Sequence, residues 1–351
     1  MAYSTIGGGQ NVYIPGADGV SGMLQVELSR SPSSFAVNRY STVMPVSKMD
    51  GRYVRLNSTE QIRVQSLAQY NWALGTDRPT GNYGQVDFKS YLTQRYGFTG
   101  RIPTETGAQA SFDAIGYEAR LQATKAMTAR SVAAATALGT SGNWADQGFT
   151  NIYASWTALM NGAYTSGGGA IGTEGNAQAG FQAASLLIQQ SSSGVINPFR
   201  DLVCVVNPYT AAYISQLTEV KSYVKNMVRS TEFLEGNGLF GNHWNLPPGF
   251  FGIREVVVED AVKITSNQGA TLAESYCIPN KVAVFVSRPG GLVQNAAQSS
   301  FSTLVNFVYE DMTVEQFSSA ENRYTTVSVV DNYAYAVAAP VTGIYVTDIT
   351  A

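Results

Sequence analysis

The last third of the chain contains a dense series of segments rich in Val, Phe, Tyr and Thr, residue types that are favoured in β-strands. Five such runs follow one another, at 281–288, 304–310, 323–330, 332–337 and 343–347. An open, glycine-rich N-terminal third lies far upstream of them. This combination favours a subunit made for assembly, and by itself it does not indicate a catalyst.

Charged residues are scarce in this chain. They make up 13% of its 351 residues, against about 25% in an average soluble chain. Because surface charge keeps isolated proteins soluble, the scarcity favours extensive contact with other chains. The 20 tyrosines suit protein interfaces, since tyrosine joins a rigid apolar ring to a polar tip, but aromatic residues are also common in strands.

The charge pattern and the cysteines exclude several classes of function. The formal net charge is −3 and no block of Lys or Arg occurs, so we expect no tight or specific DNA binding. Cys204 and Cys277 lack any metal-binding spacing, and we expect two buried free thiols. The chain opens without the pattern of a signal peptide, and no apolar stretch approaches the length of a membrane span.

One long helix is predicted at about 108–138. Thr104 or Thr106 would cap its start, and Gly139 stands where a helix normally stops. Some 30 residues at 1.5 Å each give roughly 45 Å, so we expect a spine that lies against a sheet or another helix. The apolar or small residues of its stripe are Phe112, Ile115, Ala119, Ala123, Ala126, Met127, Ala133 and Ala137.

The middle of the chain is predicted to be mixed α+β. Residues 152–160 and 177–190 can form helices, and 202–206 is a continuous apolar run that suits a buried strand. Asn207 and Pro208 follow it as a natural N-cap and first helical residue. Residues 253–259 and 277–287 are expected to be strands of the same sheet.

The N-terminal part is predicted to be an arm followed by an excursion. Glycines and prolines interrupt residues 1–45 repeatedly, so this arm would become ordered by lying on a neighbour. Residues 42–65 alternate as strands do. Residues 71–87 are rich in Gly, Pro and Asn, which is typical of the tip of a long hairpin.

Signals for chemistry are weak. His243 is the single histidine and has no nucleophile elbow beside it. The spacing of Gly167, Gly169 and Gly172 fits a dinucleotide fingerprint, but a helix precedes it and no acid stands at the required distance. The acids Glu255, Glu259, Asp260, Glu310 and Asp311 could form a pair, and positions at strand ends explain them equally well. We expect no enzyme activity, no cofactor and no metal.

Taken in order, the elements resemble those of the major capsid proteins of tailed bacteriophages, which have the Hong Kong 97-like fold. The resemblance is spread over nearly the whole chain and no single motif is specific to the family. The segments that carry it are Tyr91-x-x-x-Arg95-Tyr96-Gly97, Val203-Cys-Val-Val-Asn207-Pro208, Phe307-Val-Tyr-Glu310, Tyr333-Ala-Tyr-Ala-Val337 and Gly343-Ile-Tyr-Val346.

The resemblance implies an α+β fold with a set domain order. Its parts would be an N-terminal arm (1–45), a strand of the peripheral domain (46–61), an extended E-loop (62–105), a spine helix of the peripheral domain (106–144), an axial domain (145–300), and C-terminal strands that return to the peripheral domain (301–351). The E-loop tip would contact neighbouring subunits, with the candidate residues Gly75, Asp77, Arg78, Pro79 and Tyr83.

The resemblance also implies a function and partners. The chain would form pentamers and hexamers in an icosahedral shell that encloses phage double-stranded DNA without binding it specifically. A separate scaffolding protein, a portal and a decoration protein would be its partners. Its place would be the virion, after assembly in the host cytoplasm, and it would have no contact with a membrane.

Three other interpretations remain open from the sequence. An encapsulin-like compartment would use the same fold around a cargo enzyme. A soluble hydrolase would need an acid pair in a pocket. A tail-tube or fibre protein would be all-β, which the predicted long helix argues against.

Overall fold

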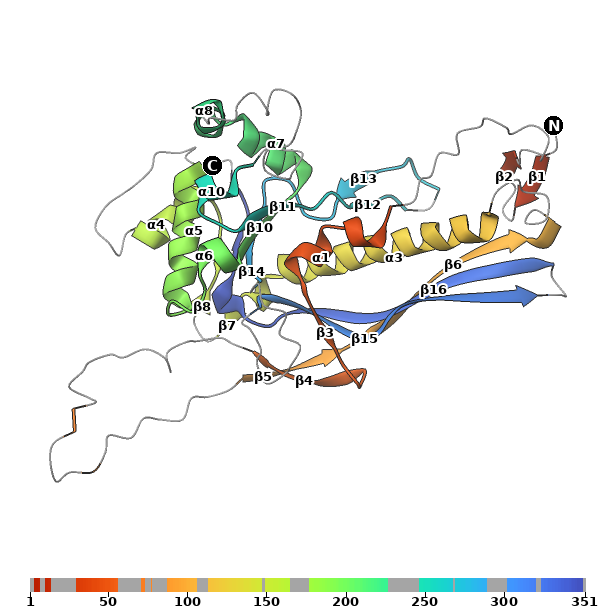
Figure 1. The fold of residues 1–351 in the computed structure, drawn as a ribbon, viewed down its shortest axis with the longest axis horizontal. Coiled ribbons are helices and arrows are strands. Elements are labelled where there is room, and N and C mark those ends of the chain that lie inside the picture. Colours follow the sequence, from red (N-terminus) through yellow and green to blue (C-terminus); the bar gives the residue numbers. More distant parts are fainter. Residues whose placement is uncertain are drawn as a thin grey trace.

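The computed structural model describes residues 3–6, 10–13, 30–55, 71–72, 77, 87–105, 113–146, 149–164, 177–226, 246–267, 269–288, 302–319 and 323–349. Two units are visible in Figure 1: a long sheet with one helix along it, and a second sheet surrounded by shorter helices. The fold is thus mixed α+β, as the sequence predicts.

The long sheet has the strand order β3-β15-β16-β6. β15 (Leu304–Ser319) pairs antiparallel with β16 (Tyr324–Val337), with two irregularities near Glu310. β3 (Thr42–Pro45) pairs parallel with the start of β15, and β6 (Gln94–Pro103) pairs antiparallel with β16. The predicted strand at 304–310 is therefore longer than its apolar run, because it continues into a polar half.

The long helix is α3 (Ala114–Gly139), which has 26 residues, or about 39 Å. It runs along one face of the long sheet (Figure 1). It ends at the predicted glycine, but the predicted cap is wrong: the Asp113 side chain caps the helix by accepting a hydrogen bond from the Gly116 N–H at 2.9 Å. Thr104 lies just after β6, and residues 106–112 are outside the described part.

The second sheet has the order β11-β10-β14-β17-β9. β10 (Leu202–Val206) is buried throughout, parallel to β11 (Glu255–Val258) and antiparallel to β14 (Ala283–Ser287). The prediction that these segments share a sheet is confirmed. β17 (Ile344–Val346) and β9 (Ile152–Tyr153) complete it, so the segment predicted as helix from residue 152 begins instead with a strand.

Helices cover this second sheet. They are α4 (Trp156–Tyr164), α5 (Ala177–Ser191), α6 (Pro198–Asp201), α7 (Pro208–Gln216), α8 (Thr218–Asn226) and α10 (Pro248–Phe251). The predicted cap of α7 is confirmed, since the Asn207 side chain accepts a hydrogen bond from the Thr210 N–H at 2.7 Å. Gly180 lets α5 approach Trp156, because a Cβ there would lie 2.7 Å from the indole ring.

The second sheet is buried on both faces. One face packs under its own helices and the other packs against the long helix, so the sheet joins the two units. Leu202, Cys204 and Val206 pack into the core under α4 and α5. Val203 and Val205 alternate with them and pack into a second core. That second core also contains Met127 and Leu138 of α3, and Val37 and Tyr40 of α1 (Val37–Tyr40).

Smaller elements complete the described fold. They are the paired strands β1 (Tyr3–Ile6) and β2 (Gln10–Tyr13), β4 (Asp50–Arg55) and β5 (Asp87–Leu92), β7 (Ala145–Asp146) and β8 (Phe149–Thr150), β12 (Val262–Ile264) and β13 (Glu274–Tyr276), and the 3-10 turns η1 (Pro32–Ser34), η4 (Ser141–Asn143) and η7 (Pro340–Thr342). The C-terminal residues predicted as one group divide between the two sheets: β15 and β16 lie in the long sheet, and β17 lies in the second.

Candidate assembly surfaces

The β4–β5 hairpin positions the predicted excursion. Arg55, the last residue of β4, pairs with Asp87, the first residue of β5, so the chain leaves and returns at the same end of the hairpin. Asp77 is exposed. The other four predicted tip residues, Gly75, Arg78, Pro79 and Tyr83, lie outside the described residues, so the predicted contact at this tip stays a prediction.

Aromatic rings fix the hairpin on the long sheet. The Tyr91 ring stacks on the Phe307 ring of β15 with centroids 4.5 Å apart, and the Tyr53 ring lies 5.1 Å from the same ring. A guanidinium N–H of Arg55 donates to the Asn143 carbonyl at 2.6 Å. This anchor was not predicted from the sequence. The strand-type residues around Tyr53 and Arg55 indicate a strand but do not identify Phe307 as its packing partner.

The outer face of the hairpin exposes apolar residues among the polar Asp50, Arg52 and Ser90. Val54 and Phe88 form a directly paired cross-strand contact on this face, and they are 56% and 58% exposed. Leu92, which is 64% exposed, extends the same face. Because a two-stranded hairpin is marginally stable in water and burial of apolar side chains against another chain is favourable, the Val54–Phe88 pair is a candidate contact surface.

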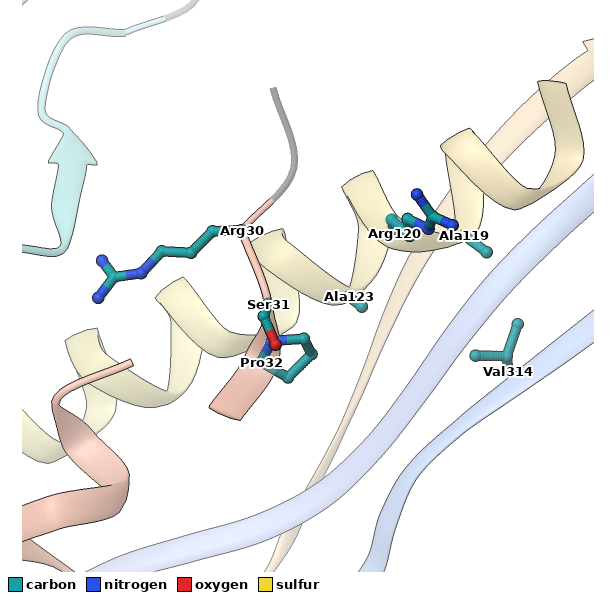
Figure 2. A pocket seen from close by; sticks show the side chains of 7 residues that line it. All are labelled: Arg30, Ser31, Pro32, Ala119, Arg120, Ala123 and Val314. Atoms are coloured by element: carbon teal, nitrogen blue, oxygen red, sulfur yellow. The ribbon is translucent and has the colours of Figure 1, made fainter. Parts of the chain in front are cut away.

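A groove of about 460 Å³ lies between α3 and β15. Figure 2 shows Ala119 and Ala123 on the side of α3 that faces Val314 of β15. Ser31, Pro32 and the two arginines Arg30 and Arg120 complete the lining. Arg30 already pairs with Asp260 at 2.7 Å and lies over the Phe35 ring, so this open groove does not resemble a catalytic pocket.

Four of the five acids considered as a catalytic pair have structural partners instead. Glu255 pairs with Arg39, and Asp260 pairs with Arg30. Asp311 pairs at 2.7 Å with Arg130 of α3, which also binds Asp331. Glu259 is fully buried and accepts a hydrogen bond from the Tyr40 hydroxyl at 2.9 Å. Burial raises the pKa of Glu259 above its ordinary value. These contacts hold α1, α3 and the two sheets together.

The remaining candidate groups offer no reactive centre in the part of the chain that the structure describes. Cys204 and Cys277 are buried free thiols, as predicted, and burial raises the pKa of both, that of Cys277 to about 12. No cluster of three His, Cys, Asp or Glu that could hold a metal occurs among the described residues. His243 and the segment from Gly167 to Gly172 lie outside them. None of the described helices is long and apolar enough to cross a membrane.

Solved structures of other proteins share this fold. No protein-family model matches the chain. No curated protein matches it either. Among solved structures, a phage-related protein from Bordetella bronchiseptica matches with a TM-score of 0.60 and 12% identity, over 90% of this chain and 92% of that one.

Two capsid structures match over a similar length. The capsid of cyanophage P-SCSP1u has a TM-score of 0.55 and 15% identity, over 95% of this chain and 92% of that one. The capsid of an empty GTA particle has a TM-score of 0.51 and 14% identity, over 96% and 95%. At these identities the likeness concerns the fold, and the chain has the α+β fold of phage capsid chains, which confirms the predicted Hong Kong 97-like fold.

Proposed function

We propose that this chain is a major capsid protein that self-assembles into the icosahedral shell enclosing the double-stranded DNA of a phage. The observation that carries the proposal is the match over 95% and 96% of the chain to two capsid subunits. Its exposed apolar hairpin face supports the same function, because a shell built from one chain needs contacts that repeat around local five- and six-fold axes.

We assign the parts of the subunit accordingly. Residues 1–45 would be the N-terminal arm, and the excursion based on β4 and β5 would be the E-loop. The long sheet with α3 would be the peripheral domain, and the second sheet with its helices would be the axial domain. β17 would then belong to the axial domain, since it pairs with β14.

The proposed shell is a container and not a catalyst. The formal net charge of −3 suits a wall that holds DNA without binding it tightly. A separate scaffolding protein, a portal and a decoration protein are the proposed partners, and assembly in the host cytoplasm followed by residence in the virion is the proposed location. The hydrolase alternative is weakened because four of the five acids it would use are engaged in ion pairs or hydrogen bonds, which leaves Glu310 without a second acid of that set to act with it.

Negative-stain electron microscopy of the purified chain tests this function. We expect closed icosahedral shells, or pentamers and hexamers. A chain that stays monomeric at concentrations up to the millimolar range would contradict the proposal. Shells that enclose a copurifying enzyme would favour the encapsulin-like alternative, so the contents of the shells are to be identified by gel electrophoresis and mass spectrometry.

A further inference from the structure

The long sheet ends in two open edges. β3 lies beside β15 only along Val305–Val308, and no described strand lies beside residues 309–318 on that side. At the opposite side, β6 pairs with β16 along Gln94–Pro103, and its outer edge faces no other strand of the described chain. Open edges of this length are templates for pairing with another chain, and proteins that stay monomeric normally protect them.

The two edges carry opposite charge. β15 contains Glu310, Asp311 and Glu315 and has no Lys or Arg. β6 contains Arg95 and Arg101 and has no Asp or Glu. Asp311 is engaged with Arg130, which leaves Glu310 and Glu315 for other contacts. Because like charges repel, two β15 edges or two β6 edges would pair poorly, whereas one β15 edge and one β6 edge attract each other.

The charges lie on one face of the sheet. A Cβ on Gly100 would meet Glu118 of α3, so the neighbouring Arg101 points to the opposite face. Likewise, Asp331 of β16 points to Arg130 of α3, so the next residue, Asn332, and its cross-strand partner Glu310 lie on the face away from the helix. Acids at one edge and guanidinium groups at the other edge thus share the face that α3 leaves uncovered.

The register of the sheet brings these charges into rows. Glu310, Asn332 and Arg95 lie in one row across β15, β16 and β6. Glu315, Ser328 and Thr99 form a second row, and Phe317, Thr326 and Arg101 form a third. β15 and β6 run in the same direction because both are antiparallel to β16. Two copies placed side by side with their strands aligned would therefore continue each row from one molecule into the next.

We propose that β15 of one copy pairs edge to edge, as a parallel strand, with β6 of the next copy, joining the long sheets of neighbouring subunits. Glu310 of one copy then meets Arg95 of its neighbour. Phe317, which is 58% exposed in the single chain, becomes covered. Such a contact is head-to-tail, so it generates rings when its rotation closes. The proposal rests on the proposed function as a shell subunit and names the contact that would link its copies.

Charge exchange tests the contact. Arg95→Glu and Glu310→Arg each place like charges across every junction between copies. We expect the assembled fraction of each variant, measured by sedimentation, to be about tenfold lower than that of wild type. The double variant Arg95→Glu/Glu310→Arg restores attraction, and its assembled fraction should recover to near the wild-type value. Lys125→Glu on the exposed side of α3 is the matched control. Single variants that assemble normally, or a double variant no better than the single ones, would overturn the proposal.

Cysteine cross-linking provides a second test of the contact, one that does not depend on charge. Thr99→Cys is combined in three separate variants with Thr313→Cys, Glu315→Cys or Phe317→Cys, which covers the aligned register and a slip of two residues either way. Directly opposed residues in neighbouring strands lie about 5 Å apart, within reach of a disulfide. Mild oxidation should therefore produce a ladder of covalently linked chains in the one variant whose cysteines match the true register. The buried Cys204 and Cys277 should not compete, and Thr99→Cys with Lys125→Cys should give no ladder.

The outcomes separate this contact from the proposed function. Wild-type shells together with no ladder in any of the three variants would overturn the edge contact and leave the shell function standing. A ladder without shells in the wild type would support the edge contact and overturn the shell function.

Discussion

At the scale of single residues, Glu259 is the carboxyl that most clearly serves structure. It follows β11, is fully buried, and binds the hydroxyl of Tyr40 on α1. The hydroxyl donates and the carboxyl accepts, so the pair joins the N-terminal segment to the second sheet. Sequence reasoning placed this acid at a strand end, but it could not find Tyr40 as a partner because 219 positions separate the two residues.

The raised pKa of Glu259 predicts how its replacement changes stability with pH. Burial favours the protonated carboxyl in the folded state, so the stability that Glu259 contributes is present below its unfolded pKa of about 4.3 and is lost as the pH rises through the higher folded pKa. Glu259→Gln should therefore gain stability relative to wild type between pH 5 and pH 8. Urea unfolding at both pH values measures this difference, with the exposed Glu274→Gln as control.

Removal of the Tyr40 hydroxyl should also lower the free energy of unfolding. Tyr40→Phe removes the hydroxyl that donates to one carboxyl oxygen of Glu259 and leaves the weaker Ala261 N–H contact at 3.3 Å to the other oxygen, which should destabilise the fold by about 1–3 kcal/mol at neutral pH. Equal stability of Tyr40→Phe and wild type in the same urea titration would contradict the role given to this hydrogen bond.

At Gly343 the neighbouring atoms leave too little room for a side chain. A Cβ there would lie 2.7 Å from the Phe285 carbonyl oxygen and 3.0 Å from the Trp144 ring. We expect Gly343→Ala to destabilise the fold by about 1–3 kcal/mol through overpacking. Gly142→Ala has open space around it and should leave the midpoint of thermal unfolding almost unchanged. A midpoint for Gly343→Ala at the wild-type value would contradict this account.

At the scale of elements, the sequence predicted buried, apolar segments well and polar ones poorly. β10 and the cap of α7 were found because a continuous apolar run and an Asn-Pro pair carry local signals. The second half of β15 was missed because it is held by pairing with β16 and not by burial. The buried face of α3 includes Gln122, Arg130 and Ser131, so hydrophobic periodicity described it incompletely. Arg130 is buried there because Asp331 neutralises it.

The β4–β5 hairpin carries a prediction about assembly. Val54→Ser combined with Phe88→Ser removes the exposed apolar pair, and the stability of the single chain should change by less than about 1 kcal/mol, since both side chains already contact water. The assembled fraction should fall several-fold when shells are separated from free chains by sedimentation. Leu272→Ser, another exposed apolar position, should assemble like wild type. If both variants behave alike, the hairpin face is not an assembly surface.

At the scale of the whole molecule, the second sheet holds the two units together because both of its faces are buried in different cores. This arrangement was predictable only in part. The sequence indicated which segments are strands, but the position of a three-residue strand such as β17 depends on its pairing with β14, which lies about 60 positions upstream. The capsid-like order of elements was recognisable because it persists when identity falls to 14–15%.

The position of β17 has a consequence during synthesis. Ribosomes make chains from the N-terminus, yet β17 lies between β14 and β9 and is the last of the five strands to be translated. A polypeptide that stops before Ile344 leaves β9 without its neighbour in the sheet and the core without Ile344 and Val346. We expect a variant ending at Ala339 to be degraded by protease under conditions in which a variant ending at Ile349 resists it. Completion of the second sheet would thus distinguish full-length chains from prematurely terminated ones after synthesis.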